Sequence, residues 1–130
     1  MKPQLPKTTL GTTGLEVTRL GYGSGHRKPM DDQQRDTILN AVVDAGINFI
    51  DTAISYGNSE ELIGRFLKHK RDKFYLATKG NLWNADDLEN QLNRSLKRLA
   101  TDYVDVYQLH NPTIDQCRSA DLIDTLNKFK

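Results

Sequence analysis

Cysteine is nearly absent: Cys117 is the single one among 130 residues, which excludes a disulfide framework within the chain. Chains of this kind are typical of a reducing compartment. No apolar run approaches the roughly 20 residues of a membrane-spanning helix. The opening MKPQLPKTTL also lacks the apolar core of a signal peptide. We therefore expect a cytoplasmic protein with no membrane partner.

An excess of charge of either sign is lacking too, since 18 Lys and Arg stand against 17 Asp and Glu, for a net charge of +1. That balance gives no reason to expect a nucleic-acid groove. A short basic cluster, residues 68–71, fits a solvated helix end, because cations are favoured at helix C-termini. With 37% hydrophobic residues, the chain is long enough for one ordinary domain with its own core.

Several motifs of common enzyme classes are missing. Residues 21–25 read GYGSG and lack the spacing of GxGxxG, so a Rossmann dinucleotide site is poorly supported. No GxSxG or Cys–His pairing indicates a hydrolase. Close-spaced metal ligands are also lacking, so we expect no metal site.

The pattern that is present repeats along the chain. Two short runs flank Gly11–Gly14, which predicts a β-hairpin over residues 8–18. Strands are then predicted at residues 19–23, 48–51, 74–78 and 104–109, with helical patterns after each. The strand positions Gly21, Ile50, Ala77 and Tyr107 are separated by 29, 27 and 30 residues. This period predicts four βα units of a parallel α/β fold.

Capping residues mark where the helices begin. Asp31 with Gln34 and Asn58 with Glu61 both fit a capping box, and Asn84 fits an N-cap. Gly64, inside a helix, costs about 1 kcal/mol and is expected to permit close helix–strand packing. The expected apolar faces are Ile38, Val42 and Ala45 in the first helix, Leu62, Ile63, Phe66 and Leu67 in the second, and Leu88, Leu92, Leu96 and Leu99 in the third.

Four chemically suited side chains follow the predicted strands. Asp51 ends the second strand and Tyr56 lies in the loop beyond it, while Lys79 and His110 end the next two strands. Parallel α/β folds place their chemistry at this carboxyl edge. Each residue taken alone also fits a structural role, as a loop cap, a packed aromatic, a surface lysine or a structural histidine. Together they predict a rim that combines an acid, a phenol, an amine and an imidazole.

Such a set can deliver a proton to a carbonyl oxygen. A free tyrosine has a pKa of about 10, and a nearby ammonium favours the phenolate and lowers that pKa. A carboxylate beside the lysine keeps the amine charged, and a histidine can orient the carbonyl. The set contains no hydride source, so a reduction would need an external one such as a nicotinamide.

These residues lie in segments that resemble the aldo-keto reductase family. The segments are LGTTGLEVTRLGYG (10–23), DTAISYGNSEELIG (51–64), LATKG (76–80) and SLKRLATDYVDVYQLHNP (95–112), and the resemblance extends from Thr8 onward. It implies a TIM-barrel-like (β/α)₈ fold and reduction of aldehydes or ketones to alcohols with NADPH, or NADH.

The resemblance also implies roles for individual residues. Tyr56 would be the general acid, Lys79 would lower its pKa, Asp51 would pair with Lys79, and His110 would orient the carbonyl. Cofactor contacts would come from Gly23, Ser24 and Asp51. The substrate pocket would include Tyr22, His26 and Trp83 together with His110, although Trp83 fits ordinary packing equally well.

A complete barrel of this kind needs about 250 residues and eight βα units. We therefore expect residues 1–130 to form the amino-terminal half of a barrel, with no second domain, as a fragment of a longer enzyme. An open half barrel has unpaired edge strands, which invite self-association or pairing with a complementary half barrel. A non-catalytic binding or regulatory subunit of the same fold is the alternative to an enzyme acting on a small carbonyl substrate.

Overall fold

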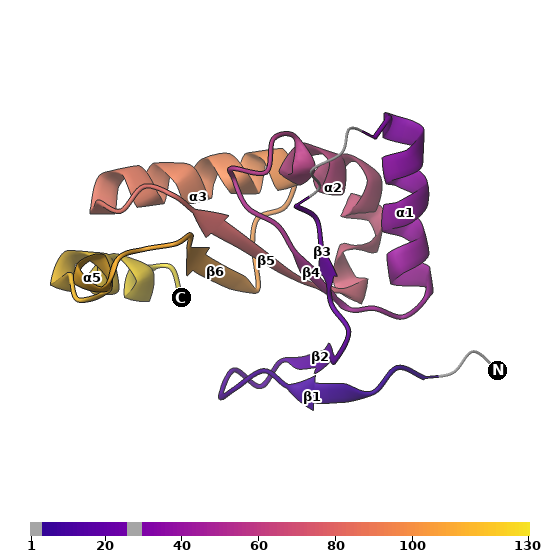
Figure 1. Ribbon diagram of the computed structural model, residues 1–130, viewed down its shortest axis with the longest axis horizontal. Coiled ribbons are helices and arrows are strands. Elements are labelled where there is room, and N and C mark those ends of the chain that lie inside the picture. The colour runs from indigo at the N-terminus through magenta and orange to yellow at the C-terminus, as the bar shows by residue number, and fades with distance from the viewer. Residues whose placement is uncertain (1–3, 26–29) are drawn as a thin grey trace.

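A computed structural model describes residues 4–25 and 30–130. In chain order its elements are β1 (Lys7–Thr9), β2 (Glu16–Thr18), β3 (Tyr22–Gly23), α1 (Asp32–Asp44), β4 (Phe49–Asp51), α2 (Ser59–Leu67), the 3₁₀ helix η1 (Lys68–Lys73), β5 (Tyr75–Gly80), α3 (Ala85–Leu99), β6 (Val106–Leu109), α4 (Ile114–Cys117) and α5 (Ala120–Lys128). Strands β3 to β6 form one parallel sheet in the order β3-β4-β5-β6, and β1 and β2 form an antiparallel hairpin. The expected parallel α/β architecture with an amino-terminal hairpin is confirmed (Figure 1).

The hairpin is fastened to the sheet by one asparagine just before β4. The Asn48 side chain accepts from the Thr18 amide at 2.6 Å and donates to the Glu16 carbonyl at 2.8 Å. Figure 1 shows the hairpin below the sheet, away from helices α1, α2 and α3. The hairpin therefore lies at the amino ends of the strands and leaves the carboxyl ends clear of its residues.

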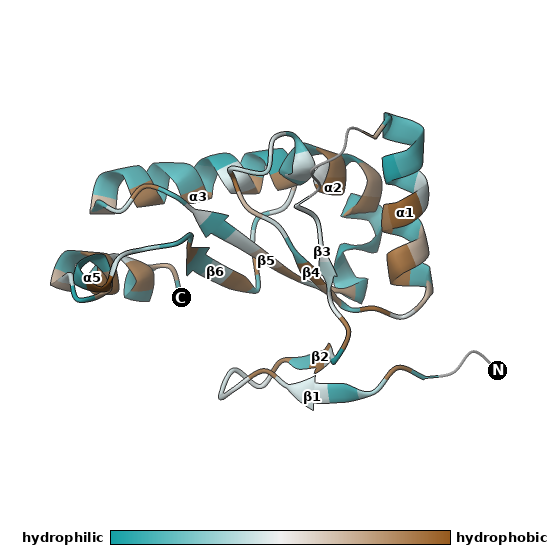
Figure 2. Ribbon diagram, viewed as in Figure 1, coloured by the Kyte–Doolittle hydropathy of each residue, from teal (hydrophilic) through white to brown (hydrophobic). Residues whose placement is uncertain are grey.

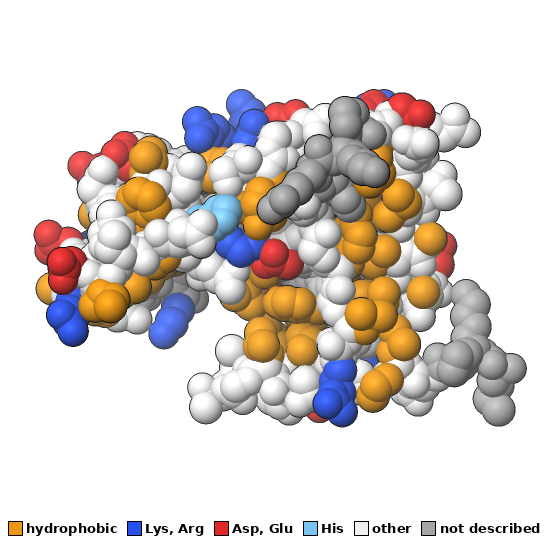
Figure 3. All heavy atoms as spheres, viewed as in Figure 1, with side chains coloured by type: hydrophobic (Ala, Val, Ile, Leu, Met, Phe, Trp, Pro, Cys, Tyr) orange, Lys and Arg blue, Asp and Glu red, His pale blue; other side chains and the backbone are white. Residues whose placement is uncertain are grey.

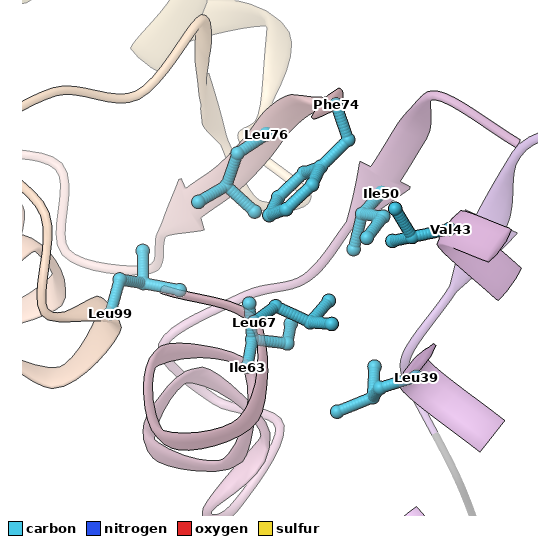
Figure 4. Close-up of a cluster of buried hydrophobic side chains, with 8 residues drawn as sticks. All are labelled: Leu39, Val43, Ile50, Ile63, Leu67, Phe74, Leu76 and Leu99. Atoms are coloured by element: carbon cyan, nitrogen blue, oxygen red, sulfur yellow. The ribbon is translucent and has the colours of Figure 1, made fainter. Parts of the chain in front are cut away.

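The apolar core lies between the sheet and the helices. Its buried cluster consists of Leu39, Val43, Ile50, Ile63, Leu67, Phe74, Leu76 and Leu99 (Figure 4). Figure 2 shows the corresponding hydrophobic segments on α1, α2 and β5. In α1 the buried residues are Leu39 and Val43, so the expected face of Ile38, Val42 and Ala45 is wrong by one position. Ile38 and Val42 are only half-buried, because they lie at the edge of the surface that α1 packs against the core.

Two of the three predicted helix caps form. Asp31 and Gln34 make the reciprocal capping box at the start of α1, and the Asn84 side chain accepts from the Asp87 amide in α3. Asn58 precedes α2 but makes no capping hydrogen bond, so the capping box expected there is wrong. Its backbone lies at φ −95° and ψ 13°, outside the extended conformation from which a side chain can reach the next turn.

Gly64 permits a close contact, but the partner differs from the expected one. A Cβ atom at Gly64 would lie 2.4 Å from the Arg98 carbonyl oxygen and 2.6 Å from the Leu99 carbonyl carbon. The glycine therefore lets α2 approach the end of helix α3, where a strand was expected. Helices α2 and α3 therefore pack directly against each other on the helix-covered face of the sheet.

In the basic cluster after α2, Lys68 and His69 are exposed as expected, but Arg71 is not. Arg71 donates to the Asp105 carboxylate at 2.7 Å, and both side chains are 14% exposed. The same carboxylate accepts from the Leu76 amide at 2.8 Å.

Across the described ranges, no helix has both the length and the apolar character needed to cross a membrane.

Candidate active site

Parallel pairing brings the ends of β4, β5 and β6 to one edge. Asp51 lies opposite Ala77, and Lys79 lies opposite Gln108, so these side chains share one face of the sheet. The β5 strand runs to Gly80, so Lys79 lies in the strand and not beyond its end as expected. His110 follows β6 directly, and its amide donates to the Gly80 carbonyl at 2.8 Å. The sheet thus holds three of the four residues by its own backbone.

Lys79 is tied to Asp51. Its ammonium donates to the Asp51 carboxylate at 2.6 Å and to the Thr52 carbonyl at 2.7 Å. The Lys79 side chain is 14% exposed and that of Asp51 is 32% exposed, so the pair lies at the boundary between protein and solvent. Two oxygen acceptors at this distance stabilise the charged amine and fix its position.

Tyr56 lies over this pair. The Lys79 ammonium is 5.3 Å from the centroid of the Tyr56 ring, and the His110 ring lies 5.6 Å away, at 87° to it. On another side, a Cβ atom added to Gly25 would come within 3.2 Å of the phenol ring. A cation, an imidazole and a bare stretch of backbone therefore surround the phenol.

The four predicted residues are thus brought together. Asp51, Lys79, Tyr56 and His110, called the quartet below, come from the carboxyl ends of the successive strands β4, β5 and β6 and from the loops that follow β4 and β6. On the face shown in Figure 3, a histidine, a basic and an acidic side chain lie side by side, with hydrophobic surface next to them.

A serine that sequence reasoning missed joins the quartet. The Ser55 hydroxyl lies 3.0 Å from Nδ1 of His110, across 55 positions of the chain. The position of Ser55 directly before Tyr56 in the loop was the only feature of the sequence that could have suggested a place in the site. Nothing in a local pattern tells which distant side chain such a serine will meet.

Hydroxyl groups support the loop from below. Ser24 donates from both its amide and its hydroxyl to the Asp51 carbonyl, at 2.9 Å each. The Ser59 hydroxyl donates to that of Ser24 at 2.8 Å and accepts from Thr52 at 3.0 Å. These side chains are buried, and they lock the end of β4 to the start of α2.

Two of the three predicted cofactor residues present groups at the rim. Gly23 is exposed beside β4, and Asp51 shows part of its carboxylate to solvent. Ser24 is only 2% exposed and its hydroxyl is used within the loop. A Cβ atom added to Gly25 would lie 3.2 Å from the Tyr56 ring, whereas one added to Gly23 would meet nothing within 4 Å. The bare backbone at these two glycines leaves room for a flat ring against the rim.

The predicted substrate residues are scattered. Tyr22 packs against the apolar core on the helix-covered face, away from the quartet, because it pairs in register with the core residue Ile50. Burial raises the pKa of Tyr22, and the nearby Arg35 of α1 offsets part of that rise. Trp83 is half-buried in the loop after β5, with its indole nitrogen buried. His26 lies outside the described residues.

Other parts of the described chain offer less. Within residues 4–25 and 30–130, no group of three or more His, Cys, Asp or Glu side chains could hold a metal ion. A hollow of about 170 Å³ lies at the amino ends of the strands, where Asn48, Tyr75 and Tyr103 contribute to its wall. Its four charged residues form two ion pairs, Arg71 with Asp105 and Lys73 with Asp72, so they do not point to a ligand.

Comparison with known proteins places this chain in a family. Residues 18–130 match the model of the aldo/keto reductase family. The chain is 40% identical over 124 residues to the aldo-keto reductase YhdN of Bacillus subtilis, an alignment that covers 81% of this chain and 38% of that protein. The chain belongs to the aldo-keto reductase family.

Solved structures agree with this assignment. The aldo-keto reductase AKR11C1 from Bacillus halodurans, in its holo form, superposes with a TM-score of 0.90 at 32% identity, covering 98% of this chain and 47% of that one. An aldo-keto reductase from Klebsiella pneumoniae, solved in complex with NADPH, gives a TM-score of 0.78 at 28% identity, covering 98% of this chain and 45% of that one. The expected TIM-barrel-type fold, with a partial set of βα units, is thereby confirmed. The chain spans less than half the length of the curated relatives it matches.

Proposed function

We propose that the quartet delivers a proton to the oxygen of an aldehyde or ketone, in an NADPH- or NADH-dependent reduction to the alcohol. One observation carries this proposal: the Lys79 ammonium, held by Asp51 at 2.6 Å, faces the ring of Tyr56, which also contacts the ring of His110. That arrangement places a cation and an imidazole ring next to one phenol side chain.

Each residue has a separate task in the proposed reaction. The Tyr56 hydroxyl gives its proton to the carbonyl oxygen as negative charge develops there. The Lys79 ammonium stabilises the charge left on the phenol oxygen, and Asp51 holds that ammonium in place. His110 donates a hydrogen bond to the carbonyl oxygen and so orients it toward Tyr56. Proton and hydride together convert C=O to CH–OH.

The hydride comes from the reduced nicotinamide when that cofactor is bound. Among the described residues, the Gly23 backbone and the Asp51 carboxylate would hold the nicotinamide end, next to Tyr56. The Ser24 hydroxyl would act indirectly, since it supports the Asp51 backbone. The Klebsiella relative solved with NADPH supports the choice of cofactor class.

The remainder of the site would be supplied from outside the described sheet. In that sheet β3 and β6 are the end strands, and the core that joins the sheet to α1, α2 and α3 lies on the face opposite Asp51 and Lys79. We propose that a complementary half barrel or a second copy of the chain covers the face that carries Asp51 and Lys79. Sedimentation velocity of the purified chain tests this: a monomer at all concentrations would contradict the second copy.

A cytoplasmic location also forms part of the proposal. Cys117 is an exposed free thiol, which suits a reducing compartment. Fractionation of cells expressing the tagged protein checks the location.

The alternative is a non-catalytic subunit of the same fold, which would keep the scaffold without needing a proton donor. The Tyr56→Phe variant separates the two readings, because it removes the hydroxyl and keeps the ring contact with His110. We expect turnover of a carbonyl substrate to fall about 10²- to 10⁴-fold, the range that general acid catalysis contributes. Tyr75→Phe, at the opposite end of β5, is the matched control and should keep full turnover.

Binding of NADPH is measured first, by fluorescence titration of the folded chain. Saturable binding, with turnover lost only in Tyr56→Phe, supports the proposal. Full turnover in Tyr56→Phe would refute the role of the phenol. If the chain is folded but does not bind NADPH, the proposal that this chain is active by itself is refuted, while its family membership still holds.

A further inference from the structure

The contact between Ser55 and His110 has no part in the mechanism above. The Ser55 hydroxyl oxygen lies 3.0 Å from Nδ1 of the His110 ring, which is hydrogen-bonding distance. Ser55 is exposed and His110 is half-buried, so the contact lies at the rim itself. A hydroxyl here bonds the ring nitrogen that does not face a substrate in the proposed reaction.

A neutral imidazole carries one proton, on either Nδ1 or Nε2, and the other nitrogen accepts. For His110 to donate to a carbonyl oxygen, that proton must be on the nitrogen turned toward the substrate. A serine hydroxyl can donate to Nδ1, and such a bond leaves the proton on Nε2. The proton position on His110 therefore depends on what its Nδ1 contacts.

The other contacts of His110 do not determine which of its two ring nitrogens carries the proton. Its amide bonds the Gly80 carbonyl, which places the backbone but not the ring. The Tyr56 ring lies edge-on at 5.6 Å and restricts the plane of the imidazole, yet the two ring nitrogens are alike to such a contact. The Ser55 hydroxyl is the described contact that distinguishes one nitrogen from the other.

We propose that Ser55 is a positioning residue: its hydroxyl donates to Nδ1 of His110 and so keeps the His110 proton on Nε2, ready for a carbonyl oxygen. This inference rests on the proposed function for its catalytic meaning. The placement of the proton itself is measured without cofactor or substrate.

The test compares side chains that differ by the hydroxyl alone. Ser55→Thr keeps the hydroxyl, while Ser55→Val has the shape of threonine without it, and Ser55→Ala removes both the hydroxyl and the bulk. Asn58→Ala, in the same loop and without a capping hydrogen bond, is the control. Thermal unfolding of all four variants checks that each is folded.

The first readout is the proton position, from long-range ¹H–¹⁵N correlation spectra of ¹⁵N-histidine-labelled chain at a pH where the imidazoles are neutral. The sequence has three histidines, and the signal of His110 is assigned by its loss in His110→Gln. We expect a single Nε2–H form in the wild type, Ser55→Thr and Asn58→Ala. In Ser55→Val and Ser55→Ala the Nδ1–H form should appear beside it.

The second readout is turnover with NADPH and a small aldehyde. We expect kcat to fall about three- to tenfold in Ser55→Val and Ser55→Ala, the effect of one hydrogen bond, with KM for NADPH unchanged. Ser55→Thr should restore kcat. Because the threonine and valine variants share a shape, a merely structural role would affect both equally.

Two results overturn the inference: an Nδ1–H form of His110 in the wild type, or identical spectra for the Thr and Val variants. Failure of the proposed function looks different. In that case no variant turns over the aldehyde, while the spectra still follow the hydroxyl.

Discussion

The two faces of the parallel sheet have opposite character. On one face, Ile50 is 0% exposed and Leu76 is 1% exposed, under the helix layer of α1, α2 and α3. On the other face, Asp51 and Lys79 carry partly exposed charges, and Gln108 is exposed. Successive residues of a strand point to opposite faces. One short strand such as β4 can therefore contribute Ile50 to the core and place the charged Asp51 on the open face.

The covered face is not purely apolar, and the difference lies in how its polar groups are paired. Glu60 is 1% exposed; its carboxylate accepts from the Thr78 hydroxyl at 2.7 Å and lies 3.6 Å from the Arg98 guanidinium. Oε2 of Glu60 makes no hydrogen bond and is held only by the ion pair with Arg98, but it is enclosed by protein, whereas the charged groups of Asp51 and Lys79 lie at the solvent boundary. Substitutions on the covered face should therefore change stability, and substitutions on the open face should change activity.

The largest expected effect comes from Glu60→Ala. It removes the buried partner of Thr78 and Arg98, and breaking a buried pair of this kind costs about 3 kcal/mol of unfolding free energy. Glu61→Ala is the matched control, because Glu61 also pairs with Arg98 but is 54% exposed, and it should cost less than about 1 kcal/mol. Urea unfolding measures both. Equal losses in the two variants would contradict the contrast between the faces.

Next is Lys79→Met, on the open face. Removal of the ammonium should lower carbonyl turnover about 10²- to 10³-fold, as loss of an electrostatic stabiliser does. Asp51 is then solvated through its exposed side, so stability should fall by only about 1 kcal/mol. Lys70→Met removes a surface lysine that pairs with Asp44 at 2.7 Å, and turnover there should be unchanged. Steady-state kinetics and thermal melts measure both effects. Unchanged turnover together with a large loss of stability in Lys79→Met would contradict the prediction.

A smaller effect is expected for Gly64→Ala in α2. In an exposed helix this change stabilises by about 1 kcal/mol. Here the added Cβ would meet backbone atoms of Arg98 and Leu99 within 2.6 Å, so overpacking should destabilise by about 2 kcal/mol. Arg65→Ala, at the exposed next position, should change stability little. The sign of the change in unfolding free energy tests the prediction, because a Gly64→Ala variant more stable than the wild type would refute the close approach of α2 and α3.

The smallest effects compare two asparagines that precede helices. Asn84→Ala removes a side-chain bond to the Asp87 amide and should cost about 1 kcal/mol of unfolding free energy. Asn58 makes no such bond, so Asn58→Ala should lie within about 0.5 kcal/mol of the wild type. Chemical denaturation of the pair measures the difference. Equal costs would mean that the Asn58 side chain does cap α2 in solution.

Much of the fold was predictable because its signals are local. A capping box joins residues three apart, so Asp31 with Gln34 was identified correctly, and the βα period predicted four parallel strands. Residues at successive strand ends must meet, and the quartet was found by that rule. The same reasoning could not tell which face Tyr22 would take in a strand of two residues, where a shift of one position reverses the side chain.

Signals that span the chain were not predictable. Gly64 was recognised as a close contact, but the contact with the end of α3 depends on how two helices cross. The partner of Ser55 is 55 residues away. The missed α1 face has a related cause, since Ile38 and Leu39 are both apolar and only packing decides which is buried.

The loops that carry the quartet are held largely by their main chain. The Thr52 amide bonds the Ala77 carbonyl at 2.9 Å, the Ile54 amide bonds the Lys79 carbonyl at 3.1 Å, and the His110 amide bonds the Gly80 carbonyl. A main-chain hydrogen bond is available to any residue except proline. In evolutionary terms, loop positions whose side chains give no such support, unlike Ser24, Thr52, Ser55 and Ser59, can be substituted while these main-chain bonds keep the quartet in place.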